Sequence, residues 1–335
     1  MGGRGGMEEE LVPRGGLRLE LVSAAGLHGV GWRRTPGNAW QAIRGLAQAG
    51  RLLRKLCPQA LLVTGGYVGV PVALAARMQR VPILIFVPDV EPALALRVVA
   101  RIAQRVAIAV EDSRRYLPAR AASVITGYPL REDLVAAKRG AARSEHGWSD
   151  RDFVLLVLGG SRGARSINRA ILACLPELLR EMHVVHVSGS LDWTEVEQSG
   201  RDLPAGLRAR YHPSAYLHES IGEMLAAADL VVSRAGGSIL GEYPFFRLPA
   251  VLVPYPHAWR YQKTNAEFLA SRGAAVILED AALDIALRQT LLGLKAEPAR
   301  LEAMRRAAAG LARSDAADNI AREFLALAQA KGAPA

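Results

Sequence analysis

Residues 156–165, which read LVLGGSRGAR, decide the fold. The apolar run at 153–158 has the length and composition of a buried strand, and Gly159 and Gly160 end it before a helical pattern begins near residue 164. A strand, a glycine-rich turn and a helix in this order form the first half of a βαβ unit.

The turn at 159–163 is also suited to hold a phosphate. Glycines let the backbone come close to the ligand, and the free N–H groups at the start of a helix attract negative charge. A tight connection without a ligand explains the same residues equally well. The glycine spacing is not the GxGxxG of dinucleotide-binding proteins, so it does not indicate a dehydrogenase.

Apolar runs and helical patterns alternate on both sides of this stretch. We predict helices at 70–80, 93–103, 164–180, 221–227 and 283–331, and further strands at 60–64, 81–86, 105–110, 122–125, 183–187, 230–233, 250–254 and 275–278. This alternation is typical of parallel sheets, and two such series indicate an α/β protein with two doubly wound domains that face each other across a cleft.

A break in the pattern separates the two series. Residues 136–152 are rich in charge and have no apolar periodicity, so we expect a linker there. The expected domains are therefore 1–135 and 153–314, which suits a chain of 335 residues.

Composition and charge narrow the class of protein. Cys57 and Cys174 lie far apart without metal-ligand spacing, and no run approaches the ~18 apolar residues of a spanning helix, so we expect a cytoplasmic protein without a disulfide or a zinc site. The net charge of +10 suits an Arg-rich surface in solvent, an anionic membrane or a phosphorylated substrate. Without aromatic interleaving or a recognition motif, it does not indicate nucleic-acid binding.

A second candidate site follows the apolar run at 230–233. Residues 228–238 read ADLVVSRAGGS, and Glu242 lies one helical turn beyond Ser238. Ser238 and the neighbouring amides can hold a phosphate, and the carboxylate of Glu242 can accept two hydrogen bonds from a ribose. An exposed acid in the first turn of a helix is the alternative for Glu242.

A third candidate site combines a rigid loop with two amides. Residues 254–257 read PYPH, and Gln262 and Asn265 follow at a spacing that puts them on one face of a helix. Amides placed in this way can bind the hydroxyls of a sugar.

Together these segments resemble one family. GGSRGARSIN, ADLVVSRAGGS…GE, LPAVLVPYPHA and QKTNA, with TGGYVGVPVALAA and TGYPLR in the first half, are similar in order and spacing to the motifs of the MurG family. Its members are UDP-N-acetylglucosamine:N-acetylmuramyl-(pentapeptide) pyrophosphoryl-undecaprenol N-acetylglucosamine transferases of peptidoglycan synthesis. The resemblance covers nearly the whole chain.

The resemblance implies a fold, an activity and a set of site residues. The fold is the two-domain GT-B arrangement, in which the helix at about 315–335 returns to the first domain. The donor substrate is UDP-N-acetylglucosamine, with no cofactor and no metal. Its diphosphate would lie at Ser161, Arg162, Gly163 and Arg131, its ribose at Glu242, and its sugar at Gln262 and Asn265. Gly66 and Tyr67 would border the acceptor.

Two departures from the family concern the first half. The start of the chain resembles the segment after the family's second strand, so we expect the family's first βα unit and the strand after it to be missing. Where the family has His-Glu-Gln-Asn, this chain has Phe86-Val87-Pro88-Asp89. The catalytic base is therefore not identified, with Asp89 and Glu91 as candidates. Asp89 has a second interpretation as the cap of a helix that begins near Pro92.

The implied acceptor, a lipid in the inner leaflet, predicts peripheral attachment at the cytoplasmic face of the membrane. Residues 32–34 and 44–55 are candidates for contact with anionic lipid. Two alternatives remain open: a transferase of the same fold with another lipid acceptor, and a non-catalytic homologue that binds a UDP-sugar.

Overall fold

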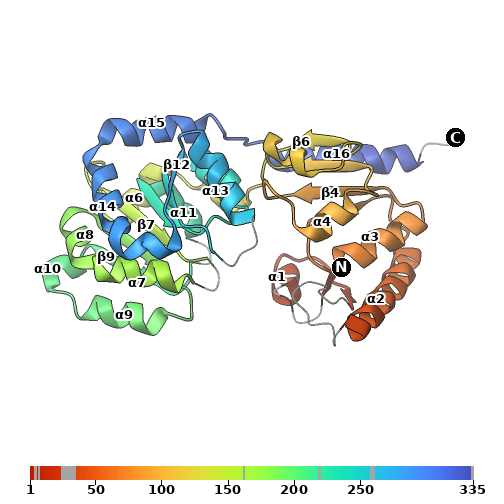
Figure 1. Cartoon of the computed structure of the whole chain (residues 1–335), viewed down its shortest axis with the longest axis horizontal. Helices are drawn as coiled ribbons and strands as arrows, with labels where there is room; N and C mark the ends of the chain where they lie inside the picture. The colour runs from red at the N-terminus through yellow and green to blue at the C-terminus, as the bar shows by residue number, and fades with distance from the viewer. Residues whose placement is uncertain are drawn as a thin grey trace. The chain divides into compact units, whose positions relative to one another are not determined.

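The computed structural model describes residues 1–3, 6, 8–23, 35–160, 163–217, 220–256 and 261–332. The chain forms two compact units, coloured along the sequence in Figure 1. Unit 1 comprises Met1–Thr126 and Ala317–Ala335, and unit 2 comprises Gly127–Ala316.

Unit 1 is built on a parallel four-stranded sheet. The strand order is β3 (Leu61–Val63), β4 (Ile83–Val87), β5 (Arg105–Ile108) and β6 (Ser123–Ile125). Its helices are α2 (Thr35–Leu56), α3 (Gly69–Met78) and α4 (Leu94–Val99), with a 3₁₀ turn at Glu111–Tyr116. β4 is buried along its whole length, which explains its unbroken apolar sequence.

Two further parts belong to unit 1. A small parallel sheet pairs β1 (Gly2–Gly3) with β2 (Leu21–Val22), and α1 (Glu8–Arg14) lies between these strands in sequence. The C-terminal helix α16 (Ala316–Gly332) packs on this unit: the Asn319 side chain donates to the carbonyl of Thr126, and Glu323 pairs with Arg105.

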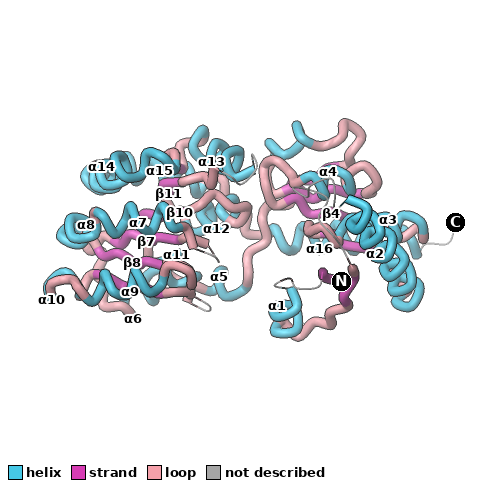
Figure 2. The backbone as a smooth tube through the Cα atoms, turned by 60° about the horizontal axis from the view of Figure 1, so that its bottom comes forward, coloured by secondary structure: helices cyan, strands magenta, loops and turns pink. Residues whose placement is uncertain are grey.

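Unit 2 is built on a parallel six-stranded sheet in the order β12-β11-β10-β7-β8-β9. The strands are β7 (Val154–Leu158), β8 (His183–Val187), β9 (Tyr211–Ser214), β10 (Leu230–Ser233), β11 (Ala250–Leu252) and β12 (Ala275–Ile277). The helices are α5 (Glu132–Ala136), α6 (Arg139–Glu145), α7 (Arg165–Ala173), α8 (Leu175–Glu181), α9 (Trp193–Arg201), α10 (Ala205–Arg208), α11 (Ile221–Ala227), α12 (Ile239–Phe246), α13 (Tyr261–Ser271), α14 (Leu283–Ala296) and α15 (Pro298–Ala309), with a 3₁₀ turn at Asp280–Ala282. Figure 2 shows the strands of this unit enclosed by helices.

The strand order of unit 2 reverses once. From β7 the chain adds β8 and β9 on one side, and it then returns to add β10, β11 and β12 on the other. Ligands of open α/β sheets bind at such a switch point, beyond the carboxyl ends of the strands. The topology therefore points to the edge where β7 and β10 end.

The structure differs from the sequence predictions in four places of unit 2. The helix predicted at 283–331 is divided into α14 and α15, and α16 follows. β9 was not predicted, because the sequence YHPS is polar; it lies at the edge of the sheet, where a proline is tolerated. The helix predicted at 164–180 is divided near Cys174 into α7 and α8, and Pro176 lies at the start of the second. Residues 136–152, predicted as a linker, contain α6, which packs on α11 within unit 2 and carries the buried Arg143.

Candidate functional site

Three loops meet at the carboxyl edge of the unit 2 sheet, because β7, β10 and β11 are neighbours and parallel. The loop after β7 carries the glycine-rich turn, the loop after β10 carries Ser238 and Glu242, and the segment after β11 leads to Gln262 and Asn265. The structure thus brings together the three sequence-predicted segments at the switch point.

The β7 loop requires glycine at two positions. Gly160 has a φ of +78° and Gly163 a φ of +82°, which other residues rarely adopt. A Cβ atom on Gly163 would lie 2.4 Å from the carbonyl oxygen of Ser188, which follows β8, so the backbone approaches more closely than any side chain would permit. α7 begins at Arg165, and its first N–H groups face the end of this turn. Ser161 and Arg162 lie outside the described residues.

The β10 loop places a carboxylate beside a hydroxyl. Ser238 precedes α12, and its hydroxyl donates to Oε2 of Glu242 over 3.1 Å. Burial raises the pKa of Glu242, opposed by the hydrogen bond from Ser238 and by the positive charge of Arg131. Arg131 therefore acts on the same site, and it also pairs with Asp133 at 3.1 Å.

The two amides of α13 bind loop backbone. Nδ2 of Asn265 donates to the carbonyl of Ala235 over 3.1 Å, and Asn265 is completely buried. Oε1 of Gln262 accepts from the N–H of Tyr255 over 2.9 Å, and Gln262 is half-buried. Asn265 thus holds the β10 loop and Gln262 the β11 loop, and Gln262 is the more exposed of the two side chains.

Sequence reasoning missed a side-chain network that ties the loops together. Arg234, in the β10 loop, donates to Oδ1 of Asp280 over 2.5 Å and to Oγ of Ser166 over 2.8 Å. Oγ of Ser166 in turn donates to the same oxygen of Asp280 over 2.7 Å. Arg234 also donates to the carbonyl of Val253 after β11, and its guanidinium lies 5.1 Å from the centre of the Tyr255 ring. The arginine within SRAGGS was the available signal, but its partners lie 68 and 46 residues away.

A second network of hydrogen bonds joins α7 to β8 and β9. His186 of β8 bonds Tyr211 through Nδ1 and Asn168 through Nε2, and Asn168 donates to Asp192. Burial lowers the pKa of His186 to about 4, so the ring is neutral at physiological pH. Asp192 also accepts from Nε of Arg165 over 3.0 Å at the start of α7. These bonds are internal to the fold and hold the helix that follows the glycine-rich turn.

The candidates in unit 1 lie at the carboxyl edge of its own sheet. Gly65 and Gly66, with φ of +135° and +74°, follow β3, and the exposed Tyr67 comes next. Asp89 follows the neighbouring strand β4 and is half-buried. The order of β3 and β4 therefore places the predicted acceptor residues and Asp89 at one edge.

The two candidate bases have different surroundings. Glu91 is buried, and its Oε1 accepts from Arg97 over 2.5 Å. The prediction that Asp89 caps the following helix is wrong, because α4 begins at Leu94 with Ala93 as its N-cap. Asp89 instead lies within the loop between β4 and α4, where its backbone carbonyl accepts from the hydroxyl of Ser113.

Comparison with known proteins agrees with these motifs along most of the chain. Residues 1–108 match the glycosyltransferase family 28 N-terminal domain, and residues 154–320 match the glycosyltransferase family 28 C-terminal domain. The UDP-N-acetylglucosamine–N-acetylmuramyl-(pentapeptide) pyrophosphoryl-undecaprenol N-acetylglucosamine transferase of Roseiflexus sp. is 43% identical over 96% of this chain and 81% of its own length. The protein of the same name from Desulforudis audaxviator is 37% identical over 94% of this chain and 86% of its own length.

A solved structure shows the same fold. The crystal structure of Acinetobacter baumannii MurG matches with a TM-score of 0.74 and 24% sequence identity, over 96% of this chain and 89% of that chain. This likeness confirms the predicted GT-B fold of two doubly wound, Rossmann-like domains. The sequence identity and the two matched domains together show that the chain belongs to the MurG family of UDP-N-acetylglucosamine-dependent glycosyltransferases.

Proposed function

We propose that this protein transfers N-acetylglucosamine from UDP-N-acetylglucosamine to undecaprenyl-pyrophosphoryl-N-acetylmuramyl-pentapeptide, the step from lipid I to lipid II. The observation that carries the proposal is the meeting of the glycine-rich turn, Ser238 with Glu242, and Gln262 at the switch point of unit 2. The names of the relatives support it.

Each part of the donor has a partner of suitable chemistry in this arrangement. The diphosphate meets the turn that ends at Gly163 and the N-terminus of α7, where N–H groups and the helix dipole favour negative charge. Glu242 accepts hydrogen bonds from the ribose, and Gln262 meets the sugar. Arg131 lies close enough to Glu242 to oppose the rise in pKa that burial causes, so it adds positive charge to the same site.

The proposed chemistry is a direct displacement with inversion. The 4-hydroxyl of the acceptor sugar attacks C1 of N-acetylglucosamine, the bond from C1 to the diphosphate oxygen breaks, and a base takes the hydroxyl proton. The helix terminus and arginine side chains neutralise the leaving UDP, so the reaction needs no metal. Asp89 is the better candidate base of the two, because Glu91 is buried in an ion pair with Arg97.

Release of UDP tests the proposal directly. The purified protein is incubated with UDP-N-acetylglucosamine and the lipid-linked N-acetylmuramyl-pentapeptide in the presence of EDTA. We expect UDP release that depends on the acceptor and yields the disaccharide lipid. Binding of UDP-N-acetylglucosamine without release would instead favour a non-catalytic homologue. Transfer to a different polyprenyl acceptor alone would favour the related transferase.

We also propose that unit 1 contacts the membrane through α3 and the neighbouring α2. No helix within the described residues is long and apolar enough to cross a bilayer. Leu74 and Met78 lie one turn apart on α3 and are 41% and 76% exposed. α2, which packs on α3, carries Arg51, Arg54 and Lys55, which suit an anionic leaflet. The other predicted contact, residues 32–34, lies outside the described residues.

The double substitution Leu74→Ser with Met78→Ser tests this surface. Burial of each side chain in lipid contributes about 1.5–3 kcal/mol, so we expect sedimentation with vesicles containing phosphatidylglycerol to weaken by roughly tenfold or more. The matched control replaces Leu191 and Ile285 of unit 2, which are 71% and 86% exposed, by Ser. Equal loss in both double variants would contradict a specific role for α3.

A further inference from the structure

A hollow of about 310 Å³ lies at the opposite edge of the unit 2 sheet from the donor loops. It is bordered by Ala228, which comes just before β10, by the end of α12, and by residues of α6 and α15. Four arginines line it against a single glutamate, Glu302. They are Arg139, Arg247, Arg305 and Arg306, and we call this hollow the arginine pocket.

Asp229 holds two of these arginines in place. Its Oδ1 accepts from Nη2 of Arg139 over 2.6 Å and from Nη2 of Arg305 over 2.7 Å. Arg305 bonds the described part of the protein through Nη2 alone, so its Nε and Nη1 donors remain for a ligand. Because the side chains are already ordered by Asp229, an anion would meet them at a reduced entropic cost.

The other two arginines add charge that no ion pair among the described residues offsets. Arg247 and Arg306 are exposed, and neither forms an ion pair with any residue that the structure describes. Asp229 is already shared with Arg143, which lies behind the pocket and is buried. Asp229 and Glu302 therefore offset only part of the positive charge of the arginine pocket, and mutual repulsion of the guanidinium groups favours a bound anion.

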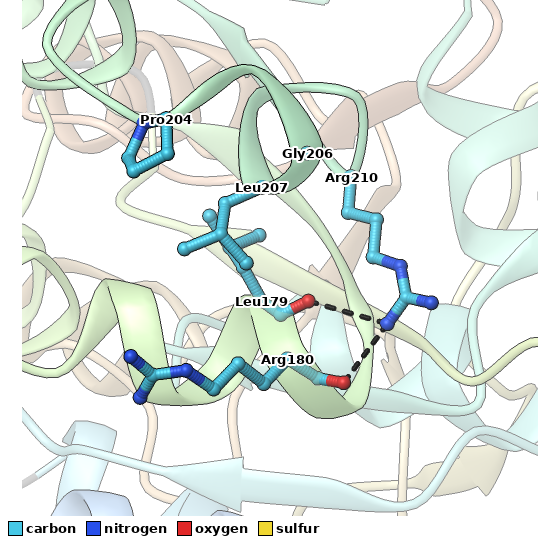
Figure 3. Close-up of a pocket in the computed structure, with 6 residues that line it drawn as sticks. All are labelled: Leu179, Arg180, Pro204, Gly206, Leu207 and Arg210. Carbon is cyan, nitrogen blue, oxygen red and sulfur yellow. Dashed lines mark hydrogen bonds between the residues drawn. The ribbon is translucent and has the colours of Figure 1, made fainter.

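A second hollow in unit 2 provides a contrast, because one of its arginines donates hydrogen bonds to backbone carbonyls of the fold. It measures about 390 Å³ and contains Arg180 and Arg210 (Figure 3). There Nη1 of Arg210 donates to the carbonyls of Leu179 and Arg180, at 3.3 Å and 2.9 Å, near the end of α8. The side chain of Arg210 thus closes a helix terminus, whereas the side chains of Arg247 and Arg306 donate to no carbonyl of the residues that the structure describes.

We propose that the arginine pocket is a binding site for a phosphate-bearing anion, separate from the donor loops. Guanidinium groups bind phosphate oxygens in pairs of parallel hydrogen bonds, and several of them around one hollow suit a diphosphate or a phosphate ester. Phe246 and Ala309 form an apolar part of the wall, which suits the organic portion of such an ester. A soluble phosphorylated metabolite and the headgroup of an anionic lipid share this chemistry.

Amide hydrogen exchange can show where an anion binds. Peptides that cover α15 are separate in sequence from those of the donor loops, so binding at the two places can be told apart. We expect inorganic pyrophosphate to slow exchange in the peptide that covers α15 in the wild-type protein. The double variant Arg247→Glu with Arg306→Glu leaves Asp229 and its partners intact. We expect it to bind inorganic pyrophosphate at this site at least about tenfold more weakly than the wild-type protein does. The matched control Arg288→Glu with Arg300→Glu changes the same charge on α14 and α15 outside the pocket.

Two arms of the experiment distinguish the sources of the phosphate. Protection by pyrophosphate that is lost in the pocket variant and kept in the control supports a soluble ligand. Protection only by vesicles containing phosphatidylglycerol, with the same difference between the variants, supports a lipid headgroup. The proposal is overturned if neither probe protects α15, or if the pocket variant and the control respond alike. Neither result depends on transfer of the sugar.

Discussion

Replacement of Glu242 by Ala lowers kcat/KM for UDP-N-acetylglucosamine by roughly a hundredfold to a thousandfold. The carboxylate is positioned by the hydroxyl of Ser238 and accepts two hydrogen bonds from the ribose in the proposed complex. Hydrogen bonds to a charged group contribute about 1.5–3 kcal/mol each, so the loss of both at the lower end of this range, about 3–4 kcal/mol together, corresponds to this factor. Initial rates of UDP release at a range of donor concentrations measure the effect.

A neighbouring acid provides the control for Glu242. Glu267 is exposed on α13, and Glu267→Ala should leave kcat/KM unchanged. If Glu242→Ala bound the donor as tightly as the wild-type protein, Glu242 would be only an acid in the first turn of α12. A lower thermal stability of Glu242→Ala is not expected, because burial already disfavours the charged form of this carboxyl.

The pH dependence gives a second measurement on Glu242. Burial raises the pKa of this carboxyl above its ordinary value, so the group takes up a proton at a higher pH than an exposed glutamate. Since the ionised form binds the ribose, donor affinity is complete above this raised pKa and falls as the pH is lowered through it. This loss should be absent in Glu242→Gln.

Replacement of Asp229 by Ala destabilises unit 2 by about 3–5 kcal/mol. The carboxylate pairs with Arg139, Arg143 and Arg305, and it accepts from the backbone N–H of Val154 over 2.9 Å. Arg143 is only 2% exposed, so the substitution leaves a buried guanidinium without its carboxylate. Urea unfolding followed by tryptophan fluorescence measures the change, since the buried Trp148 reports on this unit.

The sign of the pH effect follows from the pKa of Asp229. Burial alone would raise this pKa, but Arg139, the N–H of Val154 and Arg305 lower it below its ordinary value. The contribution to stability is therefore complete above the unfolded pKa of about 3.9 and is lost as the pH falls through the lower folded value. The difference in the free energy of unfolding between the wild-type protein and Asp229→Ala should become smaller as the pH is lowered below about 4. Asp284→Ala, which removes an exposed acid on α14, should change stability little.

Several of the strands that the sequence predicted are buried on both faces. β4, β7 and β10 read as unbroken apolar runs because helices cover both sides of a parallel sheet, so their local composition reflects their environment. β9 lies at an edge and needs no such composition, and it was missed. Residues 136–152 have few apolar side chains, yet α6 packs in unit 2 because its arginines meet Asp229, 90 residues from Arg139 in the sequence.

In the candidate site, too, some residues could be identified from the sequence and others could not. Ser238, Glu242 and the glycines of the β7 loop could be identified from the sequence, because a turn that approaches a phosphate needs these residue types at a strand end. The backbone role of Asn265 could not, because its partner Ala235 lies 30 residues earlier. Nor could the tie between Arg234, Ser166 and Asp280, or the gathering of four arginines in one pocket, since each brings together distant parts of the chain.

The sequence by itself determined the α/β class, most of the strands and the family of this protein, because these depend on local composition and on motifs of a few residues. The tertiary structure alone decided which loops meet, which amides hold backbone and where positive charge remains without a partner. The physical reason is that hydrogen bonds and ion pairs between side chains act over a few ångströms, whereas the residues that form them here are separated by tens of positions. Only the order of the strands in the sheet brings them within that range.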